Sequence, residues 1–208
     1  MTQRATPWTE VIKQDIEVAI QVERHGIAGE EEHSAPTFVS EYSLHQIWNL
    51  NSIHKRWDGT GFPPPKEIFA PDSGLIKIAS ILVLINWDRW EEFHSIFVGS
   101  HDRRDENLPF TLSALKDKGF LGATHAMLFY VQQSVCLSTV IEEGKDHVVR
   151  KGHQLPFIKE SPKKAAGAFG TVTKVLVARN HFRYADSGQL NHEHVSCQLR
   201  AVVLAIDH

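Results

Sequence analysis

The sequence predicts an α+β fold in which a helical region precedes a small antiparallel sheet. Apolar side chains recur at helical spacing in the first two thirds of the chain, beginning with the stretch from Trp8 to Ile20. The C-terminal third instead carries short runs rich in β-branched residues, and 171–178 is the clearest of them. We therefore expect two parts, a helical leader at residues 1–145 and a smaller β-rich unit at residues 146–208.

Three or four helices are expected in the leader. We place three at residues 8–20, 39–57 and 75–97, and a shorter fourth at residues 123–133. Thr6 before Pro7 has the residue types of a helix start, and Asp72 or Ser73 can cap the third helix. Residues 78–85 are apolar nearly all round, which predicts that this helix is central and buried.

The extended runs of the C-terminal third predict strands at residues 135–141, 147–150, 157–162, 171–178 and 195–199. The segments 58–65 and 142–145 are the candidate boundaries between parts of the chain, since both are rich in turn-forming or charged residues.

Composition excludes several classes of protein. Hydrophobic residues make up 42% of the chain, enough for a packed core, and the formal net charge of −3 gives no field that would attract nucleic acid or an anionic membrane. The most apolar run, 78–85, is far shorter than the roughly 20 residues that span a bilayer. No apolar signal segment follows Met1, and Cys136 and Cys197 form no disulfide framework, so we expect a cytoplasmic or nuclear protein that is not secreted.

A glycine-containing motif near the C-terminus carries the main functional hypothesis. It reads G-x-G-x-F-G-x-V with alanine at the first glycine, and its residues are Ala165, Gly167, Phe169, Gly170 and Val172. In such a hairpin, glycines let the backbone approach phosphates and the aromatic residue at the tip covers them. The alternative is a tight hairpin whose Phe169 packs on a core.

With its flanking segments, this motif resembles the fungal protein-kinase-like architecture, in which a helical leader precedes a Ser/Thr kinase domain. The other matching segments are Lys77–Ile85 followed by Trp90 and Phe93, Asp105-x-x-Leu108-Pro109, and Leu155-Pro156-Phe157. The resemblance covers roughly residues 75–200. It implies that residues 146–208 are the first strands of a kinase N-lobe, and that the family activity is phosphoryl transfer from ATP. It also implies that residues 181–192 form an extended hairpin loop, because the gap between Val172 and Gln198 is long.

Departures from the family pattern argue against turnover. The position of the V-A-I-K lysine is Gln198, in Val195-Ser196-Cys197-Gln198, and Arg200 on the same strand face would substitute only in part. No H-R-D or D-F-G string occurs in these residues, so no catalytic residue is assigned. We expect a truncated polypeptide that is inactive alone. It would keep weak or vestigial ATP binding through Ala165, Gly167, Phe169, Gly170, Val172 and Gln198, and would hold magnesium only if a C-lobe were supplied.

The main rival is a non-catalytic interaction or regulatory module whose helical leader binds a protein partner or self-associates. Trp48, Trp57, Trp87 and Trp90 would line such a groove, although packing in the helical core is the commoner role. A third alternative is an incomplete gene product with an open sheet edge at residues 195–204.

Two other groups of residues have plain interpretations. His192 and His194, with His181 and Asp186 nearby, fit a polar solvated loop better than a metal site, because zinc usually takes four ligands. Cys136 has no adjacent histidine and is expected to be a buried hydrophobe rather than a nucleophile; Cys197 is expected in the core of the sheet.

Overall fold

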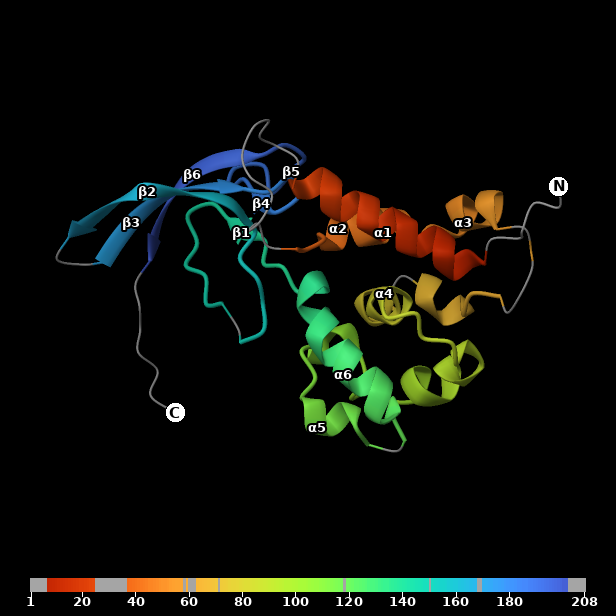
Figure 1. The fold of residues 1–208 in the computed structure, drawn as a ribbon. Helices are drawn as coiled ribbons and strands as arrows, with labels where there is room; N and C mark the ends of the chain where they lie inside the picture. The colour runs from red at the N-terminus through yellow and green to blue at the C-terminus, as the bar shows by residue number, and fades with distance from the viewer. Residues whose placement is uncertain are drawn as a thin grey trace.

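A computed structural model describes residues 7–24, 37–57, 59, 63–70, 72–117, 119–149, 151–167 and 170–201. The fold is α+β, as predicted, with helices first and small sheets after them (Figure 1). The α-helices are α1 (Trp8–Arg24), α2 (Glu41–Ile47), α3 (Leu50–Arg56), α4 (Ile76–Leu84), α5 (Leu112–Leu115) and α6 (Gly122–Gln132). Shorter turns are η1 (Lys66–Phe69), η2 (Trp90–Glu92), the π-type η3 (His94–Val98), η4 (Asp105–Asn107) and η5 (Gln133–Cys136).

One hydrophobic cluster, running from Trp8 to Leu137, holds the helices together. Its centre is α4, which is buried over Ile78–Val83 as its apolar composition predicts. The stripe of α1 that begins at Trp8 packs against it. Three of the four tryptophans considered above, Trp48, Trp87 and Trp90, are buried in this cluster, so their core role is confirmed.

The helix predicted at residues 39–57 is wrong as a single element. It divides into α2 and α3 at Trp48, and the Asn49 side chain accepts a hydrogen bond from the Asn51 amide to cap the second part. The break lets Trp48 turn into the core, where its indole N–H donates to Ser80 Oγ at 2.8 Å.

The predicted helix at residues 75–97 is also wrong beyond Leu84. Asn86 has a φ of +54°, and the chain then continues through η2 and η3 rather than as one helix. Asparagine tolerates this left-handed conformation better than most residues do. Neither Asp72 nor Ser73 caps α4. The first amides of the helix instead donate hydrogen bonds to the carboxylate of Asp105, which belongs to η4.

The strands are β1 (Ile141–Glu142), β2 (Phe157–Gly167), β3 (Gly170–Val177), β4 (Phe182–Arg183), β5 (Leu190–Asn191) and β6 (Val195–Ala201). The predicted strands at 157–162, 171–178 and 195–199 correspond to β2, β3 and β6, which are antiparallel in the order β2-β3-β6. The predicted hairpin at 181–192 carries β4 and β5, and β1 pairs parallel with β4.

Of the predicted strand at 135–141 only Ile141 lies in a strand, as the first residue of β1, and the described part of the predicted strand at 147–150, residues 147–149, is not a strand. Residues 133–136 form η5 because Val135 and Cys136 belong to the helical core, so their burial rather than their β-propensity decides the local structure. Figure 1 shows the β2-β3-β6 sheet projecting away from the helices, with the smaller β1-β4-β5 sheet lying nearer to them.

The prediction that Thr6 caps α1 lies outside the described residues, as does Phe169.

Candidate functional site

The glycine motif lies at the closed end of the β2–β3 hairpin. Gly167 and Gly170 are paired across it, and Ala165 is paired with Val172. Phe169 lies between the paired glycines but outside the described residues. A closely paired end with glycine on both strands is the local geometry that the sequence motif predicts.

The pairing of β3 with β6 brings the remaining candidate residue onto the same surface. Lys174 pairs with Gln198, and Leu176 pairs with Ser196. Directly paired residues of an antiparallel ladder project to the same face, and neighbours along a strand alternate. Val172, Lys174, Leu176, Ser196 and Gln198 therefore share one face, which we call the glycine-motif face.

The glycine-motif face is the open side of the sheet. Lys174, Ser196 and Gln198 are exposed, whereas Val172 and Leu176 are partly buried. The opposite face is covered: Val175 and Val177 are buried in a second hydrophobic cluster with Ile141 and Phe182. The partly buried Val195 and Cys197 pack against that cluster, so Cys197 is only partly in the core that was predicted for it.

The sheet joins the helices through a polar cluster, buried at Glu23, Ser40 and Asn180, that sequence reasoning missed. Glu23, at 1% exposed, accepts hydrogen bonds from the Ser40 amide (2.9 Å), Ser40 Oγ (2.5 Å) and Ser43 Oγ (2.6 Å). On the sheet side, Asn180 Nδ2 donates to Ser43 Oγ at 3.4 Å, and Asn180 Oδ1 lies 2.8 Å from His192 Nδ1. We call Glu23, Ser40, Ser43, Asn180 and His192 the polar junction.

Burial raises the pKa of Glu23 above its ordinary value of 4.5, although hydrogen bonds from Ser40 and Ser43 oppose the rise. The sequence does carry a signal for this residue. Glu23 continues the apolar stripe of α1 three residues after Ile20, a position that faces the core. An acid on such a stripe needs donors, and here the N-terminal turn of α2 supplies them.

A second contact between helices and sheet corrects one prediction. His181 was expected in a solvated loop, yet it is fully buried with its ring 5.0 Å from that of Phe38. Its Nδ1 lies 2.9 Å from the Arg179 carbonyl and its Nε2 lies 2.7 Å from Ser138 Oγ. Burial lowers the pKa of His181 to about 4, so the ring is neutral near pH 7.

The other chemically suggestive residues play structural roles. Cys136 is buried as predicted, and burial raises the pKa of its thiol to about 12, which leaves too little thiolate for a nucleophile. Within the described residues, no three histidine, cysteine or acidic side chains are grouped in a way that could hold a metal ion.

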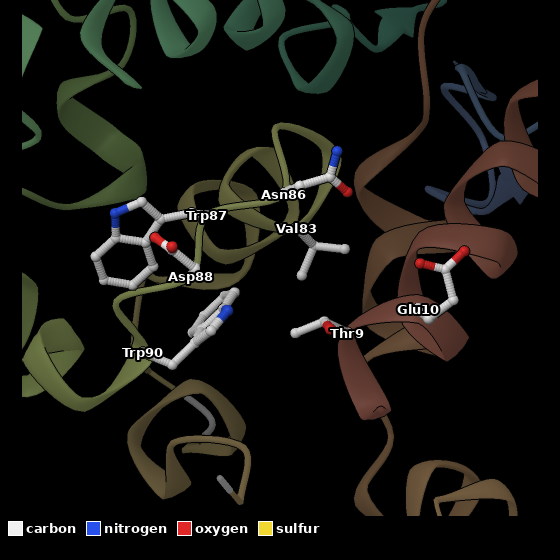
Figure 2. Close-up of a pocket in the computed structure, with 7 residues that line it drawn as sticks. All are labelled: Thr9, Glu10, Val83, Asn86, Trp87, Asp88 and Trp90. Carbon is white, nitrogen blue, oxygen red and sulfur yellow. The ribbon is translucent and has the colours of Figure 1, made fainter. Parts of the chain in front are cut away.

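A small pocket lies among the helices, at the contact of α1 with the chain that follows α4. Its volume is about 200 Å³, and Figure 2 shows Thr9, Val83 and Trp90 around its centre with the carboxylates of Glu10 and Asp88 farther out. The buried indole nitrogen of Trp90 has no hydrogen-bond partner among the described residues. The carboxylates of Glu10 and Asp88 disfavour a phosphate ligand in this pocket. The pocket therefore differs from the glycine-motif face in chemistry as well as in position.

Comparison with family models, with curated proteins and with solved structures finds no match for this chain. No helix in the described part of the chain combines the length and apolar character needed to cross a membrane.

Proposed function

We propose that this chain is a protein-kinase-like polypeptide that holds the phosphates of ATP on the glycine-motif face without completing phosphoryl transfer. The observation that carries the proposal is the arrangement of β2, β3 and β6. This arrangement brings the glycine-lined hairpin end and position 198 onto one open face of a single sheet.

The proposed chemistry is binding rather than turnover. Backbone amides near Gly167 and Gly170 would contact phosphate oxygens, and Val172 would offer apolar contact to the base. Gln198 has no charge with which to pair the phosphates. The groups that accept the substrate proton and clamp magnesium in kinases have no counterpart motif in these residues.

Calorimetric titration of the full chain with magnesium and ATP tests this proposal. We expect weak saturable heat that Gly167→Glu removes, because the added carboxylate repels the phosphates. Gln189→Glu, which adds the same charge to the exposed turn between β4 and β5, is the control and should leave the heat unchanged. An absence of heat from the unmodified chain up to millimolar ATP would refute the proposal.

A second candidate function is self-association through the helices, and one observation favours it. α6 exposes Met127, Leu128, Tyr130 and Val131, which are between 45% and 65% exposed. Residues 119–141 contain no lysine, arginine, aspartate or glutamate. Two copies could therefore pack α6 against α6 without bringing like charges together. In this candidate function the binding partner is a second copy of the chain. Sedimentation of the full chain tests it, as argued below.

A further inference from the structure

Position 198 is a glutamine and carries no positive charge, but the residue paired with it is a lysine. Lys174 on β3 is the direct cross-strand partner of Gln198 on β6. Because paired residues project to the same face, the lysine side chain leaves the sheet on the glycine-motif face, beside the glutamine. Both side chains are exposed.

Lys174 lies on the middle strand of the sheet. In the order β2-β3-β6, β3 lies next to β2, and the glycine motif continues directly into it from Gly170. Position 198 is one strand farther away, a displacement of roughly 4.8 Å between neighbouring strands. Lys174 follows Gly170 by four residues, or roughly 13 Å along an extended strand, and Val172 lies between them on the same face.

The Lys174 ammonium forms no ion pair in the part of the chain whose side chains are described, unlike Lys77, which contacts Glu41 at 2.7 Å, or Lys145, which pairs with Glu142. A lysine amine on a flexible four-carbon stem binds phosphate as a point charge and does not need a fixed fork geometry. Its apolar neighbours on the face, Val172 and Leu176, are partly buried and present no carboxylate.

We propose that Lys174 is the phosphate-binding cation of this sheet, supplying from β3 the ammonium that Gln198 does not supply from β6. The inference rests on the proposed function and makes it more specific: the ligand is a nucleoside polyphosphate whose phosphate chain runs along β3 from the paired glycines toward Lys174.

Fluorescence titration of the full chain with N-methylanthraniloyl-ATP, followed by competition with inorganic tripolyphosphate, tests the assignment. Lys174→Gln should weaken binding of both ligands about tenfold, the usual scale for one charge-assisted hydrogen bond, while Lys174→Arg retains most of it. Lys116→Gln removes an exposed lysine at the end of α5 and should leave both affinities within about twofold.

A charge exchange separates this role from a general loss of positive charge. Gln198→Lys introduced into Lys174→Gln should recover most of the lost affinity, because the ammonium returns to the paired position on the same face. If the unmodified chain binds and Lys174→Gln binds equally well, the lysine assignment is wrong while nucleotide binding stands. If the unmodified chain binds neither ligand, both the assignment and the proposed function are refuted.

Discussion

At the scale of single residues, Glu23 shows how a buried acid can be tolerated in an apolar stripe. Its two carboxylate oxygens accept the Ser40 amide and the Ser40 and Ser43 hydroxyls, so the carboxylate is buried with partners. Ser40 Oγ at the same time accepts the Ser43 amide as the N-cap of α2. One serine therefore both starts a helix and holds the acid.

The raised pKa of Glu23 predicts a pH dependence of stability. Above 4.5 and up to the raised value, the folded state binds a proton that the unfolded chain releases. The free energy of unfolding should therefore fall as the pH rises through the raised pKa. Glu23→Gln keeps the shape and can still satisfy both serines, so it should remove this contribution.

Urea unfolding of the two proteins at pH 5 and pH 8 measures that contribution. We expect the unmodified chain to lose stability relative to Glu23→Gln between the two values, and parallel behaviour would contradict the prediction. The comparison between variants is needed because His181, with its pKa lowered to about 4, contributes with the opposite sign between pH 4 and 6.5. Glu23→Ala, which leaves the serine donors unpaired, should cost about 1–3 kcal/mol.

At the scale of elements, α4 depends on a cap supplied from a distant turn. Asp105 in η4 accepts the Lys77 and Ile78 amides, each at 2.9 Å, whereas Leu75 at the N-cap position offers no side-chain acceptor. Burial raises the pKa of Asp105, although the two backbone amides oppose the rise. The Asp105 amide also donates to the Gly74 carbonyl at 2.7 Å, which fixes η4 against the start of the helix.

Asp105→Ala should therefore destabilise the chain by about 1–2 kcal/mol, because the Lys77 and Ile78 amides in the partly buried first turn of α4 lose their acceptor. Amide hydrogen exchange should accelerate first at Lys77 and Ile78. Glu106→Ala, an exposed neighbour in the same turn, is the control and should stay within about 0.5 kcal/mol of the parent. Equal effects of the two substitutions would contradict the capping role.

The elements also show which parts of the fold the sequence could predict. Periodicity located α1 and α6, whose apolar stripes are local, and β-branched alternation located β3. The predicted strand at 157–162 located the start of β2, which continues five residues farther, to Gly167. These sequence patterns failed where contacts between distant segments decide the local structure. Asp105, which caps α4, comes from a segment that meets the helix only after folding.

The candidate site divides in the same way. The glycine motif and the predicted strands on either side of it placed the hairpin end, because these are patterns local in the sequence. The position of Lys174 beside Gln198 required the register of two strands separated by the β4–β5 hairpin, which the sequence does not fix. The polar junction was missed because its members come from α1, α2 and the chain after β3.

At the scale of the whole molecule, the exposed surface of α6 predicts assembly. We expect the full chain to sediment as a dimer at tens of micromolar, because packing this uncharged face against a second copy removes apolar surface from water. Val131→Asp should shift the chain to monomer by placing like charges at the contact. Val148→Asp, at a side chain that is 81% exposed in a loop before β2, is the control. A monomeric parent chain would contradict this expectation.

The distribution of tryptophan allows the unfolding of the helices and of the β-rich part to be followed by separate fluorescence signals. All five tryptophans lie between Trp8 and Trp90, and the sheets contain none. Trp8 and Trp90 have ring centroids 4.7 Å apart, and Trp90 and Trp87 have centroids 5.2 Å apart. Emission excited at long ultraviolet wavelengths therefore reports melting of the helices alone. Tyrosine emission reports on the β-rich part once Tyr42 in α2 and Tyr130 in α6 are replaced by phenylalanine, which leaves Tyr184 next to Phe182. Different midpoints for the two signals would mean that the sheet detaches before the helices unfold.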